Sequence, residues 1–231
     1  MIDDRLTPQS REGPKKHNGA SAPRCLARYG GDVATVLVRS HLWIWWAEIA
    51  IDQLRQARAF RAQAIEVRAS GDESSRFAEL IGQETKAAMV AIAAAAHALD
   101  ALFGAVRELV PEAKTNRRWS TILETLKRTS VIKGSAGGGR WAREFEWLFD
   151  LRDSALHFQE SQAETVPHPT GTNTGPENVL YSLEPAERAV ALLLEVLETC
   201  TADPRPPLDE WAKTMRPTVD SLRKSSAGTD R

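Results

Sequence analysis

Hydrophobic side chains recur every three to four residues along most of the chain, which is the period of an amphipathic α-helix. The two longest stripes predict helices over about residues 40–70 and 72–110. Ser40 and Gly71 are typical of the two ends of the first helix. Pro111 stops the second helix, because the residue before a proline disfavours the helical conformation. The pattern therefore predicts two long helices, which we expect to lie antiparallel.

Shorter stripes predict four more helices, separated by loops rich in glycine, proline and threonine. No segment shows a convincing pattern of paired strands. We therefore expect an all-α fold, a helical bundle with two long antiparallel helices. The four shorter helices are predicted over about residues 116–128, 140–160, 185–201 and 207–223.

The two ends of the chain differ in composition from the rest. Residues 1–39 are rich in proline, glycine, serine and charged residues, and such segments rarely bury enough apolar surface to fold. We predict a disordered N-terminal segment over residues 1–39, a helical domain over residues 40–223 and a disordered C-terminal tail over residues 224–231.

Residues 87–106 are long and apolar enough to cross a membrane. They are mostly alanine, however, and they include His97, Asp100 and Gly104. We interpret them as the buried central helix of a bundle and expect no membrane partner. The N-terminus lacks an apolar run after its charged residues, so we expect no signal peptide.

The charge and the cysteines narrow the class of protein. The formal net charge is -1, so no overall basic field marks a nucleic-acid binder. Cys25 and Cys200 are the two cysteines of the chain. They form no disulfide framework, and no Cys–His cluster has zinc spacing. We expect a cytoplasmic protein with no metal and no cofactor.

One stretch is strongly basic despite the low net charge. Residues 114–143 hold eight lysines and arginines against one acid, Glu124. One interpretation is a track for an RNA backbone, and the other is a solvated helix face with its loop. The candidate RNA-binding residues are Arg117, Arg118, Arg140 and Arg143.

Arg152 is a cation within an otherwise apolar helical stripe. Its neighbours three and four residues away are Leu148, Phe149, Ala155 and Leu156. No carboxylate on that face can pair with it, so we expect a partner from elsewhere, because an unpaired buried cation is costly.

His157 follows five residues after Arg152, and Asp153 lies four residues before His157. At that spacing the Asp153 carboxylate can accept the ring N–H of His157. Such a contact would fix the tautomer of His157 and favour its protonated form.

The spacing of Arg152 and His157 resembles the Arg-x4-6-His motif of the HEPN superfamily, with Asp153 at the polar position that commonly follows the arginine. Residues 95–103 are similar to the alanine-rich long helix that precedes the motif in many bacterial members. The resemblance covers about residues 40–200. It implies a HEPN-like helical bundle and a metal-independent endoribonuclease.

The resemblance also implies roles for these residues. The ribose 2′-OH would attack the adjacent phosphorus, with His157 as general base or general acid. Arg152 would hold and neutralise the phosphate, and Asp153 would orient His157. HEPN ribonucleases join two motifs at a dimer interface, so a homodimer is implied. Bacterial members often act as toxins or antiphage effectors held by an inhibitory or effector partner protein.

Two alternatives remain open at this stage. The first is a catalytically inactive HEPN-like module that binds RNA, a nucleotide or a partner. The second is a structural helical interaction protein in which Arg152 forms an ion pair.

Other residues with possible chemistry receive structural interpretations. We expect His41 and His97 to be structural. Trp43, Trp45 and Trp46 cannot all share one helix face, so at least one should be exposed or at an interface.

Overall fold

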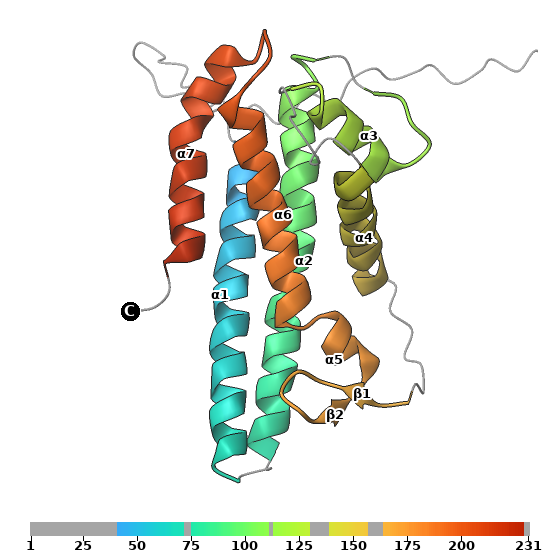
Figure 1. Ribbon diagram of the computed structural model, residues 1–231, viewed down its shortest axis with the longest axis vertical. Helices are drawn as coiled ribbons and strands as arrows, with labels where there is room; N and C mark the ends of the chain where they lie inside the picture. The colour runs from blue at the N-terminus through green and yellow to red at the C-terminus, as the bar shows by residue number, and fades with distance from the viewer. Residues whose placement is uncertain (1–40, 72–74, 111–112, 130–138, 157–163, 229–231) are drawn as a thin grey trace, which may run out of the picture. The chain divides into compact units, whose positions relative to one another are not determined.

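A computed structural model describes residues 41–71, 75–110, 113–129, 139–156 and 164–228. Most of these residues are helical, which confirms the all-α prediction. Helices α1 (Leu42–Ala69) and α2 (Ser75–Val106) form the predicted long antiparallel pair (Figure 1). The predicted N-terminal segment, residues 1–39, lies outside the described residues.

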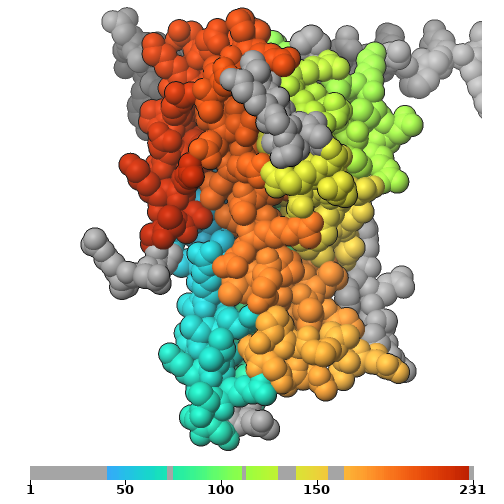
Figure 2. Space-filling model, in the orientation of Figure 1, coloured from blue at the N-terminus to red at the C-terminus, as the bar shows by residue number. Residues whose placement is uncertain are grey.

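Helix α2 lies at the centre of the helical domain. It packs against α1, α4 and α6, while α7 packs mainly on α6. In Figure 2 the surface of α6 runs between that of α7 and that of α4. The remaining long elements are α3 (Arg118–Leu126), α4 (Gly139–Leu156), α6 (Leu183–Ala202) and α7 (Asp209–Ala227).

Small residues allow this packing. Ala87, Ala88, Ala91, Ala94 and Ala95 of α2 are all buried, and short side chains let neighbouring helices approach closely. Large rings fill the space between the other helices. The largest fully buried aromatic side chains are Trp43, Phe103, Trp141 and Phe145.

Helix α2 is also the described helix that could cross a membrane by length and composition alone. However, 56% of its most apolar window is buried inside the domain. Many of its apolar side chains are therefore used to pack against α1, α4 and α6.

The structure differs from the prediction between the fourth and fifth predicted helices. Strands β1 (Val166–Pro167) and β2 (Asn173–Thr174) pair antiparallel, and α5 (Pro176–Leu180) follows them. Gly171 closes the turn between the strands with φ of +85°, a conformation that glycine adopts without steric cost. Helix α7 continues to Ala227, so the first residues of the predicted C-terminal tail are helical.

A buried polar network of the long helices lies next to this hairpin. Arg61 of α1 donates to both oxygens of Glu84 of α2, at 2.6 and 2.8 Å, and also bonds Glu184 of α6. The Glu84 carboxylate also accepts the backbone N–H of Leu183. His168, in the turn between the strands, is buried with its Nε2 at 4.0 Å from Glu84.

The protonation states of this network follow from its contacts. Burial works against the charge of Arg61, but the hydrogen bonds and charges of Glu84 and Glu184 outweigh it and raise the pKa of the guanidinium. The hydrogen bond from Arg61 lowers the pKa of Glu184 to about 2. Burial, aided by the charge of Arg61, lowers the pKa of His168 below its ordinary value.

These shifts predict acid destabilisation. The pKa of His168 in the folded protein lies below its unfolded value of 6.5. The stability that depends on a neutral His168 ring is therefore complete above pH 6.5 and is lost as the pH falls. One such proton costs at most about 1.4 kcal/mol per pH unit. Glu184 adds a second loss as the pH falls from 4.5 towards 2. Urea denaturation at several pH values between 8 and 5 measures the loss due to His168. His168→Asn should reduce the change of the free energy of unfolding with pH. A stability that rises on acidification would contradict the assignment.

Candidate functional site

An open cleft lies between α3 and α4, with a volume of about 410 Å³. Four of the seven candidate site residues from the sequence line it, three of them arginines. The cleft is lined by Arg117, Arg118, Trp119, Phe149, Asp150, Arg152 and Asp153.

Arg152 is the least exposed of these cations, with a side chain 16% exposed. Its Cζ lies 4.6 Å from the centre of the Phe149 ring, one turn earlier on α4. Its Nε and Nη2 both donate to Oδ1 of Asp153, at 2.9 and 2.7 Å. We expected Arg152 to pair with a carboxylate from elsewhere in the fold. Its ion-pair partner in the structure is instead the adjacent residue, Asp153. The long side chain bends over Phe149 and reaches a carboxylate that does not share its helix face.

Asp153 thus bonds Arg152 in the described structure. Its side chain is 57% exposed. The predicted contact with the His157 ring involves a residue outside the described ranges. In the structure, Asp153 holds the guanidinium of Arg152 in place.

Arg117 and Arg118 stand at the other side of the cleft, at the start of α3. Arg117 pairs with Glu146 of α4 and Arg118 with Asp100 of α2, both at 2.5 Å. The two arginine side chains are 63% and 50% exposed. Exposed ion pairs contribute under about 1 kcal/mol, so an entering phosphate can take the place of these carboxylates at small cost.

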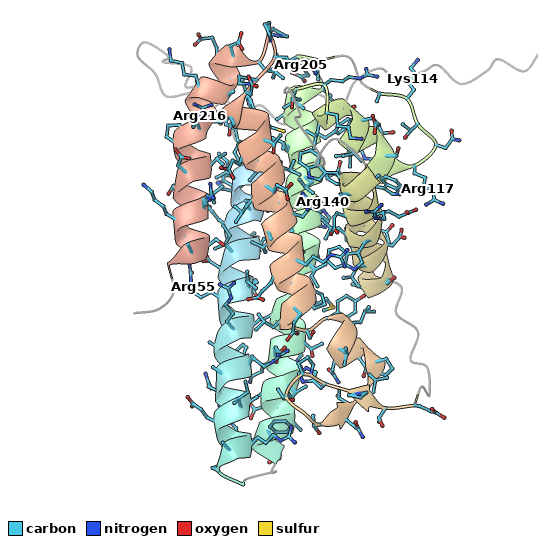
Figure 3. The ribbon with its side chains drawn as sticks, in the orientation of Figure 1. Arg55, Lys114, Arg117, Arg140, Arg205 and Arg216 are labelled. Atoms are coloured by element: carbon cyan, nitrogen blue, oxygen red, sulfur yellow. The ribbon has the colours of Figure 1, made fainter. Side chains whose placement is uncertain are left out.

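Arg140 and Arg143 do not line this cleft. Arg140 pairs with Glu195 of α6. In Figure 3 Arg117 projects on the outer side of α3, whereas Arg140 lies towards α6. The basic stretch of the sequence is therefore divided between two surfaces, and acids from α2, α4 and α6 pair with several of its cations.

His97 of α2 packs against an aromatic ring of α1. Its ring lies 4.9 Å from the ring of Trp46. Asp100, one turn later on α2, holds Arg118. Burial is the main cause of a lowered pKa of His97, and the positive charge of Arg152 lowers it further.

The described residues give no support for a metal site or for a reactive Cys200. They contain no group of three His, Cys, Asp or Glu side chains that could hold a metal ion. Burial raises the pKa of the Cys200 thiol to about 11, which keeps it protonated and makes it a poor nucleophile.

The chain was also compared with known proteins. No family model, no curated protein and no solved structure matches it.

Proposed function

We propose that the cleft between α3 and α4 binds a phosphate of RNA and that the protein is a metal-independent endoribonuclease of HEPN type. The observation that carries the proposal is the convergence of Arg117, Arg118 and Arg152 on one open cleft that also holds aromatic rings. Guanidinium groups bind phosphate in a forked geometry. Of the two rings, Trp119 is partly exposed, and a nucleic-acid base can stack on such a side chain. The cleavage step rests on the resemblance of the Arg152–His157 motif.

Arg152 is well suited to the phosphate because its position is already fixed. The contact with Phe149 and the two hydrogen bonds to Asp153 hold the guanidinium before the ligand arrives. A preorganised cation stabilises developing phosphate charge without reorganising during the reaction.

The proposed reaction is a transphosphorylation. The ribose 2′ oxygen forms a bond to phosphorus as the bond from phosphorus to the 5′ oxygen breaks. The 2′-OH loses its proton and the leaving oxygen gains one, and His157 serves one of these transfers. The products are a 2′,3′-cyclic phosphate and a 5′-OH.

Binding to a 2′-O-methyl RNA strand, which cannot be cleaved, tests the cleft. Arg118→Ala should weaken binding and lower the slope of log affinity against log salt by about one, because one phosphate contact is lost. Fluorescence anisotropy between about 50 and 300 mM salt gives the slope. Arg140→Ala is the matched control, since Arg140 belongs to the basic stretch but lies outside the cleft.

A slope for Arg118→Ala that equals the wild-type slope would contradict RNA binding at this cleft. Product analysis with ordinary RNA then separates cleavage from binding. RNA that is bound but left intact would support the inactive binding module instead.

The proposal includes a homodimer. Leu42, Trp45, Trp46 and Ile49 share one face of α1 and are between 36% and 57% exposed. Apolar patches of this kind often mark protein interfaces, and Trp46 of this patch contacts His97 of α2. A dimer mass in light scattering would support self-association, and a monomer that cleaves RNA would exclude an active site formed by two subunits.

The proposal also covers the cellular setting. We propose a cytoplasmic effector or toxin that a partner protein restrains. Expression of the wild-type chain should then slow growth, and Arg152→Ala should relieve that effect.

A further inference from the structure

A second pocket in the described part of the chain is separate from the cleft between α3 and α4. It has a volume of about 350 Å³ and is lined by Arg68, Phe77, Gly171, Thr172 and Asn173. These residues come from the last turn of α1, the first turn of α2, and the hairpin turn with β2. In Figure 1 the hairpin lies beside α2, near the end where the chain connects α1 to α2.

Arg68 brings a positive charge to this pocket. Its Nη1 donates to the backbone carbonyl of Thr170, and it forms no ion pair with the described residues. A neutral carbonyl orients the guanidinium but leaves its net charge in place. Because a guanidinium carries five N–H donors, donors remain for a ligand, and the uncompensated charge favours an anion. None of the lining residues is acidic.

The hairpin turn that holds Arg68 is itself fixed by hydrogen bonds. The Nδ1 of the buried His168 lies 2.8 Å from the Thr170 hydroxyl and accepts the Thr170 N–H at 3.2 Å. The His168 N–H donates to the Thr172 carbonyl, and the Gly171 N–H donates to the His168 carbonyl, both at 2.7 Å. A ligand therefore does not have to order this wall, which lowers the cost of binding.

Gly171 allows Arg68 to lie against the turn. A Cβ atom at this position would lie 3.0 Å from Cζ of Arg68, so a side chain there would push the guanidinium away. The pocket thus depends on a residue without a side chain as well as on a cation.

Phe77 supplies the apolar side of the pocket. The side chain is partly buried and packs on the small apolar cluster of Ala64, Leu80 and Ile81. That contact anchors the ring while part of it lines the pocket. An aromatic group of a ligand can pack against such a ring.

We propose that this pocket binds a small oxyanion that carries one flat ring, such as an aromatic carboxylate or an aryl phosphate. The anionic oxygens accept N–H bonds from Arg68, and the ring lies against Phe77. The hydroxyl of Thr172 and the amide of Asn173 add polar contacts. The volume lies near the lower end of the range for small-molecule sites, roughly 300–1,000 Å³, and suits a single ring. This site goes beyond the proposed function and does not depend on it.

An NMR titration of the whole isotope-labelled chain tests the site. Benzoate and phenyl phosphate are the anionic probes, and the stronger binder identifies the charged group that the pocket takes. At least one should shift the backbone amide signals of Gly171 and Asn173 with a Kd of about 1 mM or lower. Neutral benzamide should bind about 10-fold more weakly or worse, because it offers Arg68 no charge.

Two results of this titration would overturn the proposal. The first is that neither anion shifts these signals at about ten times the expected Kd. The second is that benzamide binds as tightly as benzoate, which would remove the role of the charge.

Variants place the anion at Arg68. Arg68→Gln should weaken binding of the preferred anion by about 10-fold or more, whereas Arg68→Lys should recover part of the affinity because it keeps the charge. Arg58→Gln is the matched control, since Arg58 also lies on α1 but pairs with Glu187 outside the pocket. Phe77→Leu should weaken binding about 3-fold through loss of the ring contact.

Thermal unfolding shows whether each variant is folded before its affinity is compared. Wild-type affinity in a folded Arg68→Gln protein would overturn the proposal. RNA does not enter these measurements, so their failure would leave the proposed ribonuclease untouched. A chain that cleaves no RNA would equally leave this pocket to be judged by its own titration.

Discussion

Arg152→Ala is expected to lower RNA cleavage on the order of 10³-fold while the protein stays folded. The variant removes the least exposed of the three cleft arginines, whose side chain is 16% exposed and packs on the Phe149 ring. Its ion pair is with the 57% exposed Asp153, so its loss should cost under about 1 kcal/mol of stability. Initial rates on a labelled RNA strand measure the first effect, and thermal unfolding measures the second.

The conservative variant and the substrate sharpen this test. Arg152→Lys keeps the charge but loses the forked geometry, so it should recover only part of the rate. Because the ribose 2′-OH supplies the nucleophile, cleavage should persist in excess chelator and stop at a 2′-deoxy position. His157→Ala should lose activity as well. Equal cleavage of DNA, or activity abolished by chelator, would contradict the proposed chemistry.

Hydrophobic periodicity was sufficient to predict the main helices. The first two were predicted over residues 40–70 and 72–110, and α1 and α2 span Leu42–Ala69 and Ser75–Val106. Stripes this long leave little ambiguity, because each apolar position faces the same neighbours along the whole helix.

The hairpin before α5 could not be predicted in the same way. Each strand is only two residues long, and its segment is rich in threonine, proline and glycine. The hairpin is positioned by contacts distant in sequence, such as the approach of His168 to Glu84. Such contacts leave no periodic pattern in the chain.

The candidate site shows the same limit. The sequence singled out Arg117, Arg118 and Arg152, which the structure brings to one cleft. It did not show that Glu146 and Asp100 would pair with the first two, because ion pairs between helices depend on packing rather than spacing.

The buried pair of Arg61 and Glu84 leads to the largest expected effect on stability. Their side chains are 9% and 1% exposed. Arg61→Met leaves the Glu84 carboxylate buried without its cation, which should lower the free energy of unfolding by about 3–5 kcal/mol. Arg58→Met is the matched control one turn earlier on α1. Arg58 pairs with Glu187, and both side chains are at least 40% exposed, so its loss should cost under about 1 kcal/mol.

The double variant Arg61→Met with Glu84→Gln shows whether the cost comes from the orphaned charge. It removes both charges and keeps an oxygen that can accept the N–H of Leu183, the bond that Glu84 makes at 3.0 Å. Stability should return to within about 1 kcal/mol of the wild type, because a buried ion pair often contributes little beyond what replaces it. Urea denaturation, with the dependence on urea checked for each variant, gives the free energies. If Arg61→Met costs no more than Arg58→Met, the network does not hold α1 to α2. If the double variant is as unstable as Arg61→Met, the loss arises from packing around Arg61 rather than from the charge of Glu84.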